Sequence, residues 1–254
     1  MKKVNRKTNV DIALEWDQIS DVRFQQIRDN KDLSLKHILK PCILELINPC
    51  NKEKVLDIGC GTGNLTSYLA NYSDEIIGID LSGKSIEVAA ENFQRENMSF
   101  QNYSIEQFAK FNNESTYSLV VANMVLMDVA ELPTVIKSIK DIIKNNGHFV
   151  FTITHPCYWP VYWEYFDENW FNYKEELYIE SAFKIATEKV KHRTTHIHRS
   201  LEHYVNTLCS EGFIIEKMIE PIPNEEVLPV FPKNNSYPRF MGIRCKLLKT
   251  KNKY

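Results

Sequence analysis

Residues 55–64 read Val55-Leu56-Asp57-Ile58-Gly59-Cys60-Gly61-Thr62-Gly63-Asn64 and are the most informative segment of the chain. Its first four residues form a short apolar run that predicts a buried strand, and residues 64–71 carry apolar side chains at helical spacing. A glycine-rich turn between a strand and a helix is the context in which such a motif indicates a ligand site. Only eight of the 254 residues are glycine, and Gly59, Gly61 and Gly63 all lie in this turn. We therefore expect the backbone of the turn to come close to a ligand.

Short apolar runs alternate with helical patterns along most of the chain. Beyond residues 55–58, we predict strands at residues 76–79, 98–103, 118–123, 149–153, 213–219 and 240–248. Helices are predicted at residues 64–71, 82–94, 132–144 and 200–212, and residues 9–47 are expected to be helical as well. Strands that alternate with helices indicate parallel β-α-β units. We therefore expect an α/β fold with a doubly wound, mostly parallel sheet of seven strands.

The chain divides into four predicted parts around this pattern. Residues 1–50 form an N-terminal helical segment, residues 51–156 a ligand-binding core, and residues 199–254 a last helix with two closing antiparallel strands. Residues 157–198 interrupt the alternation directly after the fifth strand, and residues 158–173 hold nine aromatic residues, including three of the four tryptophans. An insertion at that point lies over the carboxyl ends of the strands, so we expect an aromatic cap there.

Composition and charge narrow the classes of function. Lys and Arg number 31 and Asp and Glu 33, which gives a net charge of −2 and no basic stripe of the kind that binds nucleic acid. The six cysteines are scattered without a CxxC pair, a usage typical of a reduced, cytoplasmic protein. The longest apolar run, residues 119–130, is interrupted by Asn123 and Asp128 and is too short to cross a membrane. We expect neither a nucleic-acid partner nor a membrane partner, and the oligomeric state stays open.

A carboxylate at the end of the second strand indicates what the turn binds. Asp80 lies about twenty residues beyond the glycines, where an acidic side chain can accept hydrogen bonds from ribose hydroxyls. A dinucleotide site has the spacing G-x-G-x-x-G, but here the third glycine comes one residue early and Asp57 precedes the first. An acid in the turn disfavours a pyrophosphate and favours a cationic nucleoside ligand.

The run from Asp57 to Gly63 resembles the first motif of the class I S-adenosylmethionine-dependent methyltransferases, and residues 54–156 resemble that family as a whole. The resemblance is to the small-molecule, methyltransferase type 11-like branch, and it implies S-adenosyl-L-methionine as the cofactor. On this resemblance the cofactor contacts Trp16, Asp57, Gly59, Gly61, Asn64, Asp80, Leu81, Ser104, Ile105 and Asn123. Ser104 stands where the family usually has an aspartate against the adenine.

Within this set the resemblance assigns different parts of the cofactor to different residues. Asp80 takes the ribose, and Leu81 together with Ser104–Ile105 lies against the adenine. Trp16 and Asn123 lie toward the methionine and its sulfonium.

The sulfonium already activates the methyl group, so holding an acceptor in line supplies much of the rate. A general base is needed only where the acceptor loses a proton. His155 at the end of the fifth strand is the first candidate, with loop-holding as an equal alternative, and the resemblance adds His198 and Arg199 near the acceptor. The cap tryptophans Trp159 and Trp163 are predicted to contact the acceptor as part of a lid, and the alternative is that the aromatic block is the core of a small subdomain.

The sequence thus predicts an enzyme that methylates an N or O atom of a small molecule. Alternatives are a tRNA or protein methyltransferase on the same fold, an NAD(P)-dependent oxidoreductase, or a non-catalytic cofactor-binding protein. The Asn-Pro-Pro-aromatic motif of nucleic-acid amino-methyltransferases is replaced by Asn123-Met124-Val125-Leu126. A metal site would have to use the histidines of residues 192–203, and since no HExxH motif or cysteine pair accompanies them, we predict none.

Overall fold

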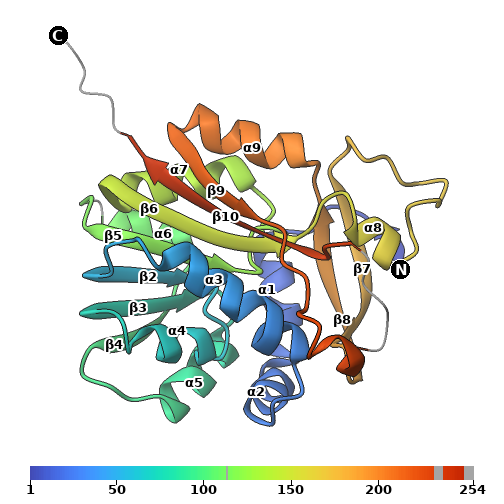
Figure 1. The fold of residues 1–254 in the computed structure, drawn as a ribbon, viewed down its shortest axis with the longest axis horizontal. Coiled ribbons are helices and arrows are strands. Elements are labelled where there is room, and N and C mark those ends of the chain that lie inside the picture. The colour runs from blue at the N-terminus through green and yellow to red at the C-terminus, as the bar shows by residue number, and fades with distance from the viewer. Residues whose placement is uncertain (113, 232–236, 249–254) are drawn as a thin grey trace.

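The strand before the glycine-rich turn lies inside a mixed sheet. The computed structural model describes residues 1–112, 114–231 and 237–248, and within them a seven-stranded sheet has the order β4-β3-β2-β5-β6-β10-β9 (Figure 1). Its strands are β2 (Lys54–Ile58), β3 (Glu75–Asp80), β4 (Met98–Asn102), β5 (Tyr117–Asn123), β6 (Ile143–Thr154), β9 (Phe213–Ile219) and β10 (Phe240–Leu247). The first five in chain order pair in parallel, and β10 runs antiparallel to both β6 and β9. The predicted α/β fold and its seven sheet strands are confirmed.

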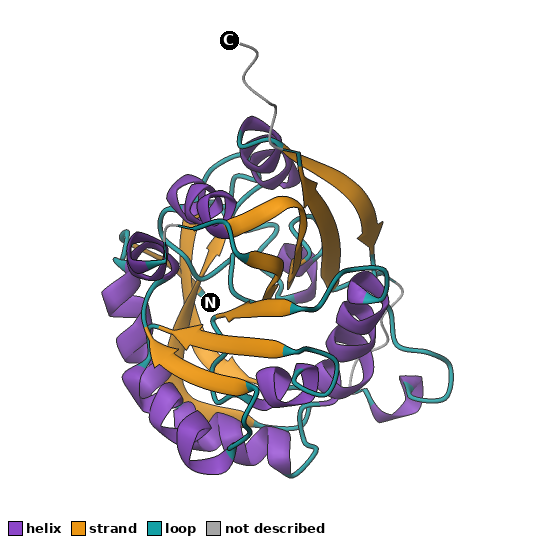
Figure 2. Cartoon of the chain, turned by 90° about the vertical axis from the view of Figure 1, so that its left-hand side faces the viewer, coloured by secondary structure: helices purple, strands orange, loops and turns teal. Residues whose placement is uncertain are grey.

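Helices cover both faces of this sheet (Figure 2). They are α1 (Asn9–Asp17), α2 (Ser20–Arg28), α3 (Lys40–Ile47), α4 (Asn64–Leu69), α5 (Gly83–Asn92), α6 (Ile105–Phe111), α7 (Leu132–Ile142) and α9 (Leu201–Ser210), with a π-helical turn at Leu35–Leu39 and a 3-10 turn at Leu228–Val230. The region predicted as helical over residues 9–47 is therefore three helices and a π turn. Among the described residues, no helix combines the length and the apolar character that crossing a membrane requires.

Burial on both faces explains why the central strands are continuous apolar runs. Leu56 and Ile58 of β2 pack into one apolar cluster with α6, α7 and α9, and Val55 packs into a second cluster with α3 and α4. These five helices therefore form two core layers with β2, and the parallel strands are held rigidly between the layers. Their carboxyl ends form the fixed edge on which the site is built.

A second, smaller sheet was not predicted from the sequence. Strands β1 (Lys2–Val4), β7 (Leu177–Lys184) and β8 (Lys189–His198) pair antiparallel in the order β1-β7-β8 among the described residues. The short helix α8 (Trp159–Tyr162) lies beside them at the right of Figure 1. The cap predicted for residues 157–198 is thus α8, its following loops and the β7–β8 hairpin, completed by the N-terminal strand.

Candidate active site

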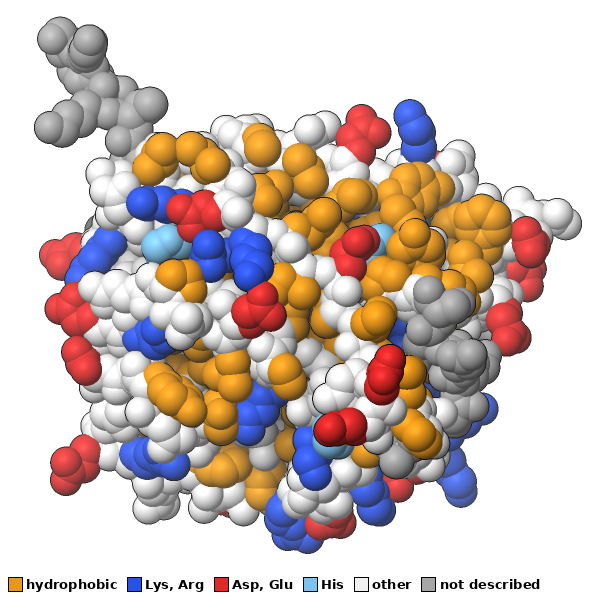
Figure 3. Space-filling model, viewed as in Figure 1, with side chains coloured by type: hydrophobic (Ala, Val, Ile, Leu, Met, Phe, Trp, Pro, Cys, Tyr) orange, Lys and Arg blue, Asp and Glu red, His pale blue; other side chains and the backbone are white. Residues whose placement is uncertain are grey.

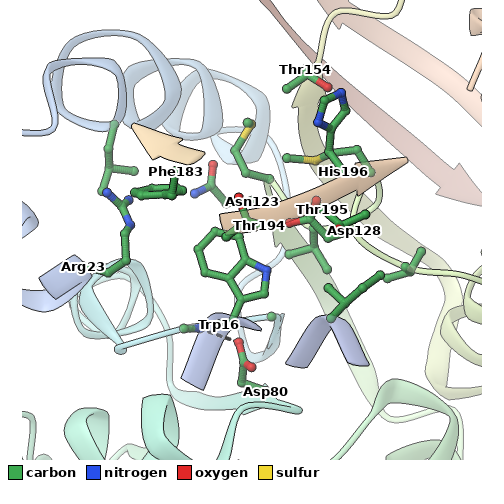
Figure 4. A pocket seen from close by; sticks show the side chains of 18 of the residues that line it. Trp16, Arg23, Asp80, Asn123, Asp128, Thr154, Phe183, Thr194, Thr195 and His196 are labelled. Atoms are coloured by element: carbon green, nitrogen blue, oxygen red, sulfur yellow. Dashed lines mark hydrogen bonds between the residues drawn. The ribbon is translucent and has the colours of Figure 1, made fainter. Parts of the chain in front are cut away.

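A pocket of about 380 Å³ opens where the parallel strands end. The glycine turn after β2, Asp80 from β3, Asn123 from β5 and Thr154 from β6 line it on the side of the large sheet. Trp16 of α1 and residues of β7 and β8 line it on the opposite side, and Figure 4 shows Trp16, Asp80, Asn123 and Asp128 around this space. The small sheet therefore covers the carboxyl edge of the large one.

Most residues predicted to bind the cofactor meet in this pocket. Its lining includes Trp16, Gly59, Gly61, Asn64, Asp80, Leu81, Ser104, Ile105 and Asn123. They come from α1, from the turns after β2, β3 and β4, and from the end of β5. The parallel arrangement brings these distant segments together, because the carboxyl ends of parallel strands share one edge.

Two glycines of the turn are required by its geometry. Gly61 has a φ of +53°, and a Cβ built there finds no atom within 4 Å, so the backbone faces open pocket. Gly59 has a φ of +62°, and a Cβ there would lie 2.4 Å from Val125 Cγ2. A side chain at position 61 would occupy space that a ligand can use, and a side chain at position 59 would collide with the loop after β5.

Asp80 ties the glycine turn to the next strand. Its Oδ2 accepts a hydrogen bond from the Gly61 N–H at 2.8 Å, and its Oδ1 accepts one from the Ser82 N–H at 2.8 Å. Burial raises the pKa of this carboxyl, while the two backbone N–H groups favour its charged form. The carboxylate is fixed at the pocket wall and retains lone pairs for a ligand.

Asp57 was predicted to bind the cofactor, but the structure places it behind the turn and outside the pocket lining. It is 1% exposed, and its Oδ2 accepts a 2.6 Å hydrogen bond from the Thr66 hydroxyl. Burial raises the pKa of Asp57 to about 7. The side chain braces the start of α4 beneath the turn, so its effect on a ligand is indirect.

Asp128 lines the pocket and was missed as a site residue. Burial raises the pKa of Asp128 well above its usual range, the Glu15 carboxylate adds to the rise, and Arg199 and the Trp16 indole favour the charged form. The sequence carried a signal here, because Asp128 is the one acid in the apolar run of residues 119–130. A carboxyl group inside an apolar run is costly to bury, so such an acid is a candidate for contact with a polar ligand.

The structure does not bring His155 into the pocket lining. His155 is 3% exposed, its Nδ1 accepts from the Cys157 N–H at 3.2 Å, and its Nε2–H donates to Glu220 Oε1 at 2.7 Å. Its own backbone N–H donates to the Arg239 carbonyl at 2.8 Å. Both ring nitrogens hold the segment after β6, so the alternative of a loop-holding histidine describes it, and the expected general base does not.

His198 and Arg199 also lie outside the lining. His198 Nε2–H donates to the Tyr173 carbonyl at 3.0 Å, and the ring packs against Phe171 and Tyr173. Arg199 is 1% exposed and pairs with Glu176 at 2.6 Å. His198 makes its contacts within the cap, and Arg199 joins the cap to the loop after β5 through the Leu126 carbonyl. The structure therefore does not support their predicted contact with an acceptor.

His196 lines the pocket, whereas His198, two residues further along the chain, was the histidine expected there. Burial lowers the pKa of His196 to about 3, so the ring is neutral at physiological pH. In the described part of the chain, no three His, Cys, Asp or Glu side chains come close enough to hold a metal ion.

The far part of the pocket is aromatic. Trp159 and Trp163 line it as predicted for the cap, with Tyr162 and Phe240 beside them. The Trp159 ring centroid lies 5.6 Å from that of Trp163 and 5.7 Å from those of Tyr162 and Phe240. Arg239 also lines this part, and it was not identified from the sequence as a site residue. Its position directly before the apolar strand β10, at one end of that strand, was the available signal.

Comparison with known proteins agrees with this arrangement. The family model described as "Methyltransferase domain" matches residues 50–220. A protein of Haemophilus influenzae described as uncharacterized is 30% identical over 211 residues, covering 78% of this chain and 82% of that protein. The ubiquinone biosynthesis O-methyltransferase of Albidiferax ferrireducens is 30% identical over 122 residues, 46% of this chain and 48% of that enzyme. The chain thus spans about half the length of that enzyme.

Solved structures share the fold at low sequence identity. An S-adenosylmethionine-dependent methyltransferase of Clostridium acetobutylicum superimposes with a TM-score of 0.62 at 19% identity, covering 89% of this chain and 98% of that one. The N-methyltransferase NodS of Bradyrhizobium japonicum, in complex with S-adenosyl-L-homocysteine, gives 0.56 at 14% identity over 83% and 86% of the two chains. The family match and this shared fold show that the chain belongs to the class I S-adenosylmethionine-dependent methyltransferases.

Proposed function

We propose that the glycine-turn end of the pocket binds S-adenosylmethionine and that the aromatic end holds a small-molecule acceptor, to which the methyl group is transferred. One observation carries the proposal. The same pocket is lined by Gly61 and Asp80 at one end and by Trp159 and Trp163 at the other. A cofactor and an acceptor in one pocket can be held in contact, which is what methyl transfer needs.

The residues at the glycine-turn end fit the cofactor. The Asp80 carboxylate has lone pairs for ribose hydroxyls, and Gly61 leaves open space where a Cβ would otherwise lie. Asp80 accepts two backbone hydrogen bonds that favour its charged form, and a cation beside Asp128 would favour the ionised form of that carboxyl, so this end suits a positively charged ligand. Arg23 also lines the pocket, but its Nη2 pairs with Asp32 Oδ2 at 2.8 Å, which offsets its charge.

The bound cofactor supplies a methyl group already activated by its positive sulfur. The chain's own residues orient the acceptor and exclude water around it. The β7–β8 hairpin, α1 and α8 cover the edge of the sheet, and the aromatic residues Phe183, Trp159 and Trp163 line the pocket. Positioning of this kind is the main source of rate in our proposal, and no basic side chain at the His155 position takes part.

A small acceptor is favoured over a macromolecule. The pocket volume of about 380 Å³ falls in the range of small-molecule sites. The net charge is −2, and Figure 3 shows basic and acidic side chains intermingled on the face in view. Relatives over part of the chain are named for ubiquinone biosynthesis, which concerns a small molecule.

The test is to follow a labelled methyl group. The purified protein is incubated with S-adenosylmethionine labelled in that group and, separately, with small metabolites, total tRNA and total protein from a cell extract. We expect label in the metabolite fraction together with S-adenosylhomocysteine. Label confined to tRNA or protein would contradict the small-molecule assignment while leaving the methyltransferase activity in place.

A further inference from the structure

Arg239 is a buried cation without an acidic partner. It is 5% exposed, and none of the ion pairs between described residues includes it. Its Nη1 donates to the Tyr162 hydroxyl at 3.0 Å, and its Nη2 has no hydrogen-bond partner although it is buried. The guanidinium carbon lies 4.8 Å from the Tyr162 ring centroid and 5.3 and 5.4 Å from those of Phe231 and Phe240.

Ring contacts of this kind stabilise a guanidinium but do not satisfy its N–H groups. A buried charge that lacks a partner is costly, because the lost hydration is not replaced. Arg239 therefore calls for an acceptor that the described chain does not supply.

Two further buried donors lie in the same place. The indole Nε1 atoms of Trp159 and Trp163 are buried and have no hydrogen-bond partner. Trp159 packs against Phe240 and Tyr162, the same rings that contact the Arg239 guanidinium, and all three donor residues line the pocket. Folded proteins leave few buried polar groups unpaired, so three donors without acceptors in one apolar chamber need a common cause.

The two ends of the pocket also differ in charge. Asp80 and Asp128 lie at the end that we assign to the cofactor, whereas Arg239 lies in the aromatic part. The other lining arginine, Arg23, is paired with Asp32. The aromatic part therefore contains one guanidinium and two indole N–H groups that lack hydrogen-bond acceptors, with aromatic rings around them.

We infer that the acceptor carries a carboxylate, bound by Arg239 and the indole N–H groups of Trp159 and Trp163, on an apolar or aromatic body. A carboxylate is planar, and its two oxygens match the fork of one guanidinium. Its oxygens can also accept hydrogen bonds from the unpartnered indole N–H groups of Trp159 and Trp163. The Lys184 ammonium, 3.8 Å from the Trp163 ring centroid, adds positive charge to the same part of the pocket. This inference rests on the proposed function, because it describes the acceptor of the same methyl transfer.

The experiment compares carboxylates with their own amides. Phenylacetate, 4-hydroxybenzoate and indole-3-acetate are each titrated against phenylacetamide, 4-hydroxybenzamide and indole-3-acetamide, with and without S-adenosylhomocysteine, by calorimetry and by the shift in melting temperature. Each pair differs only in the charged group. We expect at least one carboxylate to bind about tenfold or more tightly than its amide, since hydrogen bonds to charged groups are the stronger ones.

Variants assign that preference to its residue. Arg239→Gln should abolish the preference for the carboxylate while S-adenosylhomocysteine affinity stays unchanged, and Arg239→Lys should retain part of it. Trp159→Phe keeps the ring and removes the N–H, so it should reduce the preference by a smaller factor. Arg193→Gln is the matched control, because Arg193 is an exposed arginine of β8 that pairs with Glu180 outside the pocket lining.

The outcomes separate the two claims. If no carboxylate binds better than its amide, or if the preference survives in Arg239→Gln, the inference is overturned whatever the cofactor does. The comparison on the unmodified protein decides this even where a variant does not fold. Absence of S-adenosylhomocysteine binding would instead contradict the proposed function.

Discussion

The Asp80 carboxylate receives two backbone N–H groups, from Gly61 and Ser82, at the point where the pocket begins. These contacts fix its orientation, so its free lone pairs point consistently at a ligand. Asp80→Asn should lower the affinity for both S-adenosylmethionine and S-adenosylhomocysteine by about 1–3 kcal/mol, because hydrogen bonds to the ribose are lost or weakened. Calorimetry measures both affinities. Asp74→Asn, an exposed acid just before β3, is the control, and equal affinities in the two variants would refute the assignment.

Asp128 offers a test of where the positive sulfur lies. Burial raises the pKa of Asp128, and a cation beside it would favour the ionised carboxylate. Asp128→Asn should therefore weaken S-adenosylmethionine more than S-adenosylhomocysteine, since only the former carries a sulfonium. The ratio of the two dissociation constants, measured side by side, gives the answer. An unchanged ratio would place the sulfonium away from Asp128.

Asp57 should make stability depend on pH in a defined direction. The ordinary pKa of an aspartate is about 4, whereas burial raises that of Asp57 to about 7. Between these values the folded protein keeps a proton that the unfolded chain has lost, so the free energy of unfolding falls as the pH rises. The slope contributed is up to about 1.4 kcal/mol per pH unit. Denaturant unfolding of the unmodified protein and of Asp57→Asn from about pH 4 to pH 7 measures it, and identical slopes would contradict this account.

Residue types in the site could be predicted better than side-chain directions. The glycines, Asp80 and the cap tryptophans follow from chemistry that the sequence displays. His155, His198 and Arg199 were chosen for their chemistry too, but hydrogen bonds to Glu220, Tyr173 and Glu176 turn them into the protein. Those partners lie 65, 25 and 23 residues away along the chain, so no local sequence pattern predicts these hydrogen bonds.

Among the elements, the loop after β5 is held at three of its carbonyl oxygens by Arg199, the residue that follows β8. Arg199 donates to the carbonyl oxygens of Leu126, Val129 and Ala130 at 3.1, 2.7 and 3.2 Å, and it pairs with Glu176. The loop that it holds includes Asp128, so Arg199 is a positioning residue for the pocket.

Arg199→Ala should lower the free energy of unfolding by about 3–5 kcal/mol, because it leaves buried carbonyls and an acid without their partner. Arg193→Ala, which breaks an exposed pair with Glu180, should cost less than about 1 kcal/mol. Denaturant unfolding measures both variants. Comparable losses in the two would show that the loop does not depend on Arg199.

The strands of the large sheet could be predicted because burial on both faces makes them uninterrupted apolar runs. The small sheet could not. Strand β8 is rich in Lys, His, Arg and Thr, and β1 pairs with β7 through Lys2 and Glu180, which are far apart along the chain. Pairing of this kind depends on the register between strands that are far apart in the sequence, and the hydrophobic pattern does not predict that register.

In the whole molecule, the two sheets form opposite walls of the pocket. The large sheet fixes the glycine turn and Asp80 on a rigid edge, and the small sheet with α8 closes the pocket from the other side. The sequence predicted both the cofactor edge and an aromatic cover, because one is a local motif and the other a local excess of rings. The polarity of the pocket, acidic at one end and cationic at the other, emerges only from the folded chain.

A calorimetric titration of the purified protein with S-adenosylhomocysteine, S-adenosylmethionine and NAD tests which cofactor the pocket binds. We predict one site per chain for the first two ligands, with dissociation constants on the order of micromolar, and no comparable heat from NAD. The glycine spacing and the acidic groups at Asp80 and Asp128 are the reason, since they suit a cationic nucleoside and not a pyrophosphate. Micromolar binding of NAD, or no binding of S-adenosylhomocysteine, would contradict the account.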